Sequence, residues 1–174
     1  MSGESLKDSI ISESNTMNNY PKIVDKLIKQ GFVPDPNFRP QRCRAIILNP
    51  EGSKVLGIKR NRPGSEEYVV FPGGGVEDFD LTALDTVHRE LQEELEIEPQ
   101  QIDLTGSVLG WNNEYFYIGI ANEEFQDLVI SGPESTRDVN VSGTYIPEWF
   151  SVDSLIEINF LPEEIKSQII NSAN

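Results

Sequence analysis

Hydrophobic positions along the chain follow two periodicities, which predict helices in some stretches and strands in others. Leu84, Val87, Leu91 and Leu95 recur at helical spacing, and this stripe predicts the longest helix, Asp80–Glu96. Because strands and helices mix without regular strand–helix alternation, the pattern favours an α+β fold class over a doubly wound sheet. Strands are predicted from Arg42 and over residues 54–59, 68–71, 102–109, 114–121 and 143–150, and shorter helices over 21–30, 152–156 and 162–170.

Polar stretches between these elements indicate how the chain is organised. Met1–Asn19 is rich in Ser, Asn and Glu and has little apolar content, which predicts a flexible N-terminal tail. Asn122–Ser142 is also polar and predicts a loop between two strands. Because no internal repeat and no strong linker divides the remainder, residues 20–174 are predicted to form a single domain.

Composition and charge narrow the classes of function. The 174 residues carry a formal net charge of −15, which argues against nucleic acid as the main partner, because phosphate binding needs a basic surface. With one cysteine, Cys43, and one histidine, His88, an internal disulfide, a cysteine-built zinc site and a histidine-rich metal site are excluded. No apolar run is long enough for a membrane span and no secretory leader is recognised, so we expect a cytoplasmic protein without a membrane partner. The sequence leaves the oligomeric state open, a homodimer included.

A dense cluster of glutamates marks the end of the longest predicted helix. Glu90, Glu93 and Glu94 lie at i, i+3 and i+4, so they project from one helix face. Like charges at these spacings repel unless a cation offsets them, and carboxylate oxygens are ligands that hard divalent cations prefer. A solvated acidic face is the alternative. The glycines at 73–75 favour a site, because small residues let the backbone approach a metal–phosphate ligand closely.

The glycine segment and the glutamate helix together resemble the signature of the Nudix hydrolases. That signature is a glycine, five residues, a glutamate, seven residues, and then Arg-Glu-apolar-any-Glu-Glu-any-Gly-apolar. This chain has Pro72-Gly73-Gly74 and, further on, Arg89-Glu90-Leu91-Gln92-Glu93-Glu94-Leu95.

The chain departs from the signature in the residues around the core of the motif. One extra residue separates Gly74 from Arg89, so the first signature glutamate falls on Asp80 when counted forward and on Leu81 when counted backward. Asp80 is the closer chemical match, although it is one methylene shorter. Glu96 stands in place of the late glycine, so the helix ends differently.

The resemblance implies a fold and a metal site. The fold would be a Nudix-like α/β/α sandwich with a mixed central sheet. The resemblance implies Mg²⁺ or Mn²⁺ as the cofactor, with Arg89 orienting a glutamate. The implied metal ligands are the Gly74 carbonyl, Glu90, Glu93 and Glu94.

The resemblance also implies a reaction, namely metal-dependent hydrolysis of a pyrophosphate linkage in a nucleoside diphosphate-linked or related small molecule. Divalent ions would neutralise the phosphates and lower the pKa of a bound water, and a carboxylate would take its proton. Glu93 and Glu94 are candidates for catalysis, and the general base is not assigned. The alternative is a Nudix-like sensor that binds a nucleotide without cleaving it, which the altered Asp80 region and Glu96 would support.

Residues that would meet the substrate are expected outside the signature. Arg42 and Arg44 share one strand face and Arg60 lies in a basic cluster with Lys59 and Arg62, and guanidinium groups match phosphate oxygens. Pairing with surface acids is the alternative for all of them. Further candidates for the general base are the acids Glu114, Glu134 and Asp138, for which a surface role is the alternative. Candidates for stacking on a base of the substrate are the aromatic residues Tyr68, Trp111, Phe116 and Tyr117, for which a core role is the alternative.

The extra residue before Arg89 predicts how the chain enters the helix. A slip inside the helix would rotate the glutamate face by ~100°, whereas a loop absorbs one residue easily. We therefore expect the loop to bulge and the glutamate face to stay turned toward Gly74. We also expect Asp80 to point toward the metal region and mostly cap the helix, and Leu81 to pack on the core.

Overall fold

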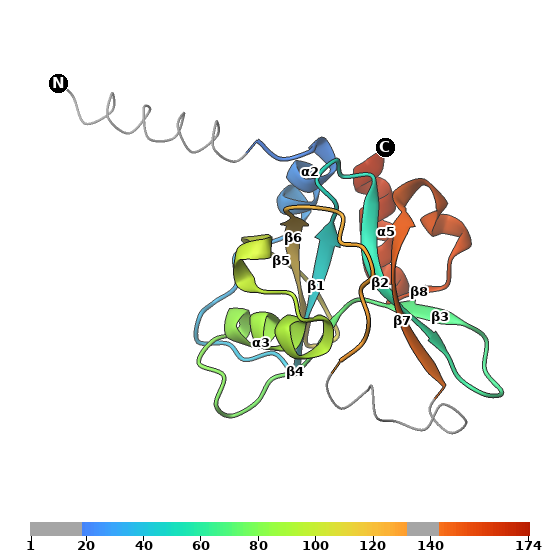
Figure 1. Ribbon diagram of the computed structural model, residues 1–174. Coiled ribbons are helices and arrows are strands. Elements are labelled where there is room, and N and C mark those ends of the chain that lie inside the picture. Colours follow the sequence, from blue (N-terminus) through green and yellow to red (C-terminus); the bar gives the residue numbers. More distant parts are fainter. Residues whose placement is uncertain (1–18, 132–142) are drawn as a thin grey trace.

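The computed structural model describes residues 19–131 and 143–174 (Figure 1). The predicted N-terminal tail lies outside these residues except for Asn19, and so does the second half of the predicted loop at 122–142. Residues 122–131, the described part of that loop, contain neither a helix nor a strand. Within the described ranges no helix is long and apolar enough to cross a membrane.

The described strands form one mixed sheet, which is the sheet expected from the fold class. Its main order is β5-β6-β1-β2-β3-β8, with β4 added to β1 and β7 added to β2. The β1–β6 and β3–β8 pairs are parallel and the other pairs are antiparallel. The strands are β1 (Arg42–Leu48), β2 (Lys54–Asn61), β3 (Tyr68–Val70), β4 (Gly73–Gly75), β5 (Ile102–Trp111), β6 (Glu114–Ala121), β7 (Thr144–Ser151) and β8 (Phe160–Leu161).

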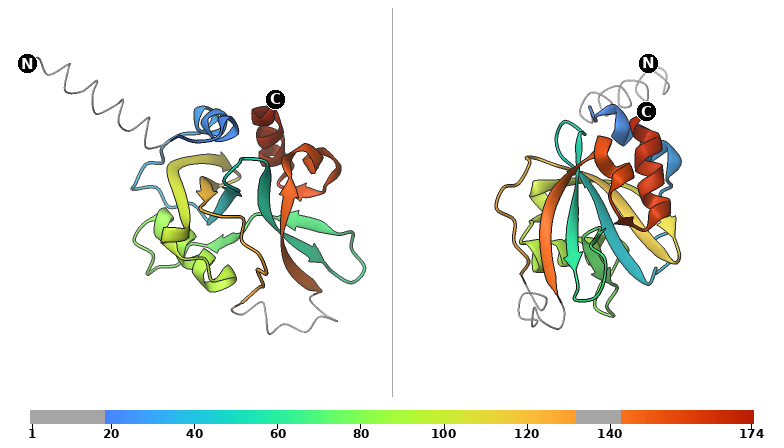
Figure 2. Two further views of the ribbon diagram at one scale, coloured as in Figure 1. Left: turned by 45° about the horizontal axis from the view of Figure 1, so that its top comes forward. Right: turned by 90° about the vertical axis from the view of Figure 1, so that its right-hand side faces the viewer.

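Helices cover both faces of this sheet (Figures 1 and 2). Helix α3 (Ala83–Leu95) lies on one face, while α2 (Lys22–Gln30) and α5 (Glu163–Ala173) lie side by side on the other. Short 3₁₀ turns at Pro99–Gln101 and Val152–Glu157 complete the described helical elements. The arrangement confirms the predicted sandwich of helices around a mixed sheet.

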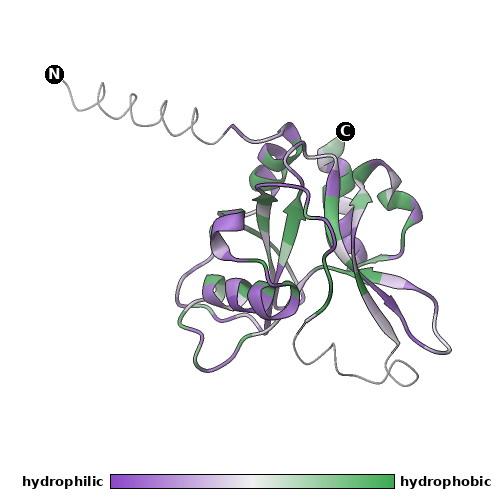
Figure 3. Ribbon diagram, viewed as in Figure 1, coloured by the Kyte–Doolittle hydropathy of each residue, from purple (hydrophilic) through white to green (hydrophobic). Residues whose placement is uncertain are grey.

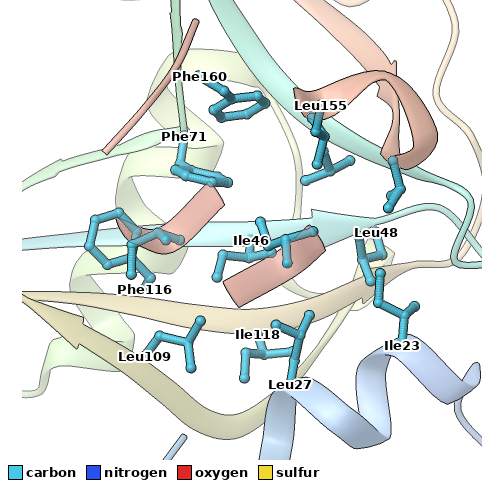
Figure 4. Packing of buried hydrophobic residues seen from close by; sticks show 14 of the residues in the cluster. Ile23, Leu27, Ile46, Leu48, Phe71, Leu109, Phe116, Ile118, Leu155 and Phe160 are labelled. Carbon is cyan, nitrogen blue, oxygen red and sulfur yellow. The ribbon is translucent and has the colours of Figure 1, made fainter. Parts of the chain in front are cut away.

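The alternation of side chains along β1 explains why its second half, residues 45–48, is apolar at every position. Ile46 and Leu48 pack into the cluster under α2 and α5, whereas Ala45 and Ile47 pack into the cluster under α3. Figure 4 shows the first cluster, with Ile46 and Leu48 among side chains from the neighbouring strands and α2. Figure 3 shows the apolar strands in the centre and the polar surfaces of the helices outside. Burial on both faces therefore fixes β1 at the middle of the molecule.

Helix α3 begins later than its hydrophobic stripe predicts. The N-cap is Thr82, whose side chain accepts a hydrogen bond from the Asp85 amide while Asp85 accepts one from the Thr82 amide. The C-cap, directly after the last helical residue Leu95, is Glu96, which adopts a left-handed conformation with φ 56°. Glycine suits this position best, and a residue with a side chain is less favourable there by ~1 kcal/mol.

The extra residue is absorbed before the helix, as predicted, but two details of that prediction are wrong. Leu81 is 85% exposed rather than packed on the core. Asp80 does not cap the helix, because Thr82 does, and it is 4% exposed beneath the helix face. A buried carboxylate needs partners, and Asp80 finds them in the helix itself.

Candidate functional site

Asp80 anchors the loop to helix α3 through Arg89. The Arg89 guanidinium donates two parallel hydrogen bonds to Asp80, Nε to Oδ1 and Nη2 to Oδ2, each 2.9 Å long. The Thr86 hydroxyl and the Glu77 amide each donate a further bond of 2.9 Å to Asp80 Oδ2. These donors, Arg89 first, hold the pKa of the Asp80 carboxyl well below its usual range. Asp80 is therefore ionised and holds Arg89 in place.

Arg89 uses its remaining N–H groups on the glutamate face and on the glycine strand. Nη1 donates to Glu90 at 3.1 Å and to Glu93 at 3.2 Å, and Nη2 donates to the Gly75 carbonyl at 3.1 Å. The carboxylates also raise the pKa of the Arg89 guanidinium, the Asp80 bonds contributing most. One rigid planar group thus fixes two of the expected metal-binding carboxylates relative to β4.

The glutamate face of α3 lies directly against the glycine strand β4. A Cβ atom built on Gly74 would lie 2.5 Å from Cδ of Glu90, so only glycine leaves room for that carboxylate. The Gly73 amide donates a long hydrogen bond of 3.4 Å to Glu94. Glu93 is half exposed and keeps its contact with Arg89. The predicted register of the helix is confirmed, because the face carrying these carboxylates is turned toward β4.

The donor set suits a hard cation, although its ligands do not converge. Among the residues that the structure describes, no three acidic or other ligating side chains come close enough to form a metal cluster. Glu90 and Glu93 instead face Arg89, and Glu94 faces the Gly73 amide. All the side-chain donors on this face are nevertheless carboxylate oxygens, the ligands that Mg²⁺ and Mn²⁺ prefer.

A cavity of about 460 Å³ opens beside Glu94 and is lined by arginines. It brings together Arg42, Arg44 and Arg60, the three residues expected to meet substrate, with Arg62 as a fourth. The chain has seven arginines in all, so more than half of them gather at one place in a protein of net charge −15. The cavity is therefore locally basic, which the net charge of the whole chain does not indicate.

The arginines of this cavity are held to different degrees. Arg44 donates to Glu114 at 3.1 Å and to the Phe71 carbonyl at 3.0 Å, so its guanidinium is fixed in the wall. Arg60 lies over the ring of Tyr145, with its Cζ 3.7 Å from the ring centroid. Arg42 and Arg62 are exposed at the cavity.

Other candidates from the sequence are distributed between the site and the core. Tyr68 lines the arginine cavity, whereas Phe116 and Tyr117 are buried core residues. Lys59 pairs with Glu148 at 2.9 Å, as the alternative of surface pairing predicts. Glu114 is engaged with Arg44, and the candidate bases Glu134 and Asp138 lie outside the described residues.

Tyr145 and Arg39 belong to the site region and were missed by sequence reasoning. Tyr145 pairs with Arg60 across the β2–β7 register, a contact that becomes visible only when the strands are aligned. Arg39 donates from Nη2 to the carbonyls of Glu77 and Asp80, both at 2.8 Å. It lies in a proline-rich connector, where no pattern indicates a partner forty residues away.

Sequence comparisons relate the chain to known hydrolases. A family model of the NUDIX domain matches residues 39–169, which is well over half of the chain. An RNA pyrophosphohydrolase from Francisella tularensis subsp. mediasiatica is 26% identical over 129 residues, covering 64% of this chain and 79% of the relative. An uncharacterized Nudix hydrolase, NudL, from Cronobacter sakazakii is 27% identical over 103 residues, covering 52% of each chain.

Solved structures share the fold at low identity. A MutT structure from work on Aliivibrio salmonicida and Vibrio cholerae has a TM-score of 0.53 and 20% identity, covering 77% of this chain and 98% of that one. A Caenorhabditis elegans Ap4A hydrolase has a TM-score of 0.52 and 15% identity, covering 76% and 95%. The NUDIX domain of Shewanella oneidensis NrtR, complexed with ADP ribose, has a TM-score of 0.50 and 22% identity, covering 80% and 91%. With the signature residues, the matched domain and this fold in agreement, the chain belongs to the NUDIX family, and the prediction of a Nudix-type pyrophosphohydrolase is confirmed at that level.

Proposed function

We propose that this protein hydrolyses the pyrophosphate linkage of a nucleoside diphosphate-linked or related small molecule, using Mg²⁺ or Mn²⁺. The observation that carries the proposal is the position of Glu94, which lies on the glutamate face of α3 and also lines the arginine cavity. Cation ligands and phosphate ligands therefore meet at one place. A pyrophosphate needs both, because its charge must be neutralised on several oxygens at once.

In this proposal Glu90, Glu93, Glu94 and the Gly74 carbonyl hold the cations. The carboxylates would have to converge on binding, since Arg89 holds two of them in the present arrangement. A bound divalent ion supplies charge neutralisation and a water of lowered pKa. Arg89 orients Glu90 and Glu93, and Asp80 keeps the guanidinium in place.

The arginine cavity would receive the phosphates, next to Glu94. Arg42, Arg44 and Arg60 support this assignment, because guanidinium groups bind phosphate oxygens in bidentate geometry. The relative from Francisella is named for acting on RNA, so an RNA 5′ end is a second phosphoanhydride to include among the substrates tested. We place the activity in the cytoplasm as part of the same proposal.

Metal removal and a substrate panel test the proposal directly. Protein stripped with a chelator should release no product from nucleoside triphosphates, dinucleoside polyphosphates, nucleotide sugars, ADP-ribose or triphosphorylated RNA, and Mg²⁺ or Mn²⁺ should restore release from at least one. Full activity after rigorous metal removal would contradict the metal's role. Thermal stabilisation by a nucleotide without any product would favour the sensor instead.

A further inference from the structure

The last turn of α3 carries two of the proposed cation ligands, Glu93 and Glu94, but its own sequence stabilises it poorly. Glu96, directly after the helix, adopts a left-handed conformation at the position where the Nudix signature has a glycine. No basic residue lies in this turn, although a cation would stabilise the negative end of a helix. The three carboxylates instead add negative charge at that end. The turn that presents these ligands therefore needs support from outside the helix.

Ser131 gives this support from the segment after β6, which reaches the C-terminal end of α3 (Figure 1). Its hydroxyl donates to the Glu93 carbonyl at 2.6 Å, and its amide donates to the Glu94 carbonyl at 2.7 Å. The last four carbonyls of a helix have no partner within the helix. Here the Glu96 amide donates to the Gln92 carbonyl at 3.0 Å, and Ser131 provides a donor to each of the next two carbonyls. Ser131 thus caps α3 from a distant part of the chain.

The segment that carries Ser131 is itself fixed to the core. Phe125 is buried in the cluster under α3, and Leu128 and Ile130 pack against that cluster. The indole of Trp149, in β7, donates from Nε1 to the Phe125 carbonyl at 3.0 Å. Because the core and the sheet hold this segment, Ser131 can hold the last turn of α3 in place rather than move with it.

We infer that Ser131 is a positioning residue for the metal site, which keeps the last turn of α3 wound and so holds the carboxylates of Glu93 and Glu94 in register for the cations. The inference rests on the proposed function and deepens it by naming what fixes these ligands from the backbone side. Arg89 holds the Glu93 side chain, whereas Ser131 holds the main chain that carries it. Ser131 also compensates for the missing signature glycine, so a glycine at position 96 should make the contact dispensable.

Amide hydrogen exchange tests the support of the helix without metal or turnover. In Ser131→Ala the amides of residues 93–96 should exchange about fivefold faster, because one hydrogen bond that opposes opening of the last turn is lost. Ser131→Thr keeps the hydroxyl and should exchange like the wild type. The matched control is Ser172→Ala, since the Ser172 hydroxyl donates to the Gln168 carbonyl at 2.8 Å in α5, on the other face of the sheet. This control should leave exchange in α3 unchanged.

Mn²⁺ titration and steady-state kinetics test the link to the metal site. Ser131→Ala should raise the Mn²⁺ dissociation constant and lower kcat, each about tenfold, as expected when a metal ligand loses a supporting contact, while KM stays within about twofold. Glu96→Gly in the Ser131→Ala background should restore most of the affinity and of kcat, because glycine adopts the left-handed conformation without a steric penalty. Ser131→Thr and Ser172→Ala should keep the wild-type Mn²⁺ affinity.

Three results would overturn the inference in a protein that binds Mn²⁺ and hydrolyses a substrate. These are unchanged exchange in Ser131→Ala, unchanged Mn²⁺ affinity despite faster exchange, and equal losses of affinity in Ser131→Ala and Ser172→Ala, which would make lost stability the cause. A wild-type protein that neither binds Mn²⁺ nor hydrolyses any substrate of the panel would instead refute the proposed function, and the positioning role with it.

Discussion

Substitution of Gly74 by alanine tests whether the position of the Glu90 carboxylate matters for activity. A Cβ atom on Gly74 would lie 2.5 Å from Cδ of Glu90 and 2.6 and 2.7 Å from its two oxygen atoms. Since carbon atoms pack at about 3.5 Å, the carboxylate must retreat by about 1 Å. The methyl group would thereby displace one proposed cation ligand and leave the rest of the face unchanged.

The expected effect on activity is much larger than the effect on stability. A displacement of about 1 Å at a reacting centre costs about 100-fold in rate, so kcat should fall by that order. The free energy of unfolding should change by less than about 1 kcal/mol, because Gly74 has no positive φ and the crowded atoms end a movable side chain. Mn²⁺ affinity should fall together with kcat.

The neighbouring glycines provide matched controls. Gly75→Ala has no atom within 4 Å of the new Cβ and should keep wild-type activity. Gly73 has φ 142°, and its Cβ would meet the backbone carbonyl of Cys43, so Gly73→Ala should lower the free energy of unfolding by about 2 kcal/mol. Denaturant unfolding, product release and Mn²⁺ titration on the three variants separate these outcomes. Wild-type kcat in Gly74→Ala, or equal losses in Gly74→Ala and Gly75→Ala, would refute the reasoning.

Three further substitutions test the rest of the site. Asp80→Asn should lower the free energy of unfolding by about 3 kcal/mol at pH 7, because Arg89 loses its buried partner. The pKa of Asp80 is lower in the folded protein than in the unfolded chain, so its ionised carboxylate stabilises the fold above the unfolded-state pKa of about 4, and this stabilisation is lost as the pH falls. The free energies of unfolding of Asp80→Asn and wild type should therefore converge toward low pH. A difference that stays constant with pH would contradict this. Glu94→Gln should reduce kcat by at least about 100-fold, whereas the control Glu98→Gln, beyond the site, should leave kcat unchanged. Similar losses in both variants would show that the overall negative charge of this segment matters, and not the site. Arg39→Ala should lower kcat about tenfold at unchanged KM and Arg39→Lys should recover part of it, whereas a change in stability alone would show that Arg39 is only structural.

The local pattern was sufficient for most elements of the fold. The stripe on α3, the alternation in β1 and the apolar run in β3 predicted their elements, because periodicity reports which faces are buried. The start of α3 was misplaced by three residues, since the sequence does not rank Asp80 against Thr82 as the N-cap. Only the position of Arg89 decides that question, because it draws Asp80 under the helix.

The glycine segment illustrates a second limit. No strand was predicted at Gly73–Gly75, yet the segment forms β4 and pairs with β1 through Arg42, Cys43 and Arg44. A Cβ on Gly74 would collide with a side chain from α3, not with its own neighbours in sequence. The need for glycine is thus tertiary at Gly74, whereas at Gly73 the positive φ makes it local as well.

The sequence by itself determined the family, the mixed α+β class and the helix face with Glu90, Glu93 and Glu94, because spacing along one helix fixes which side chains share a face. Only the tertiary structure gathered the four arginines into one cavity beside Glu94, since they come from β1, β2 and the segment after β2. It also set Ser131 against the carbonyls of Glu93 and Glu94, although the segment after β6 is distant from α3 in sequence. Charge and composition add over the whole chain, but a site depends on which residues the sheet order brings within a few ångströms of one another.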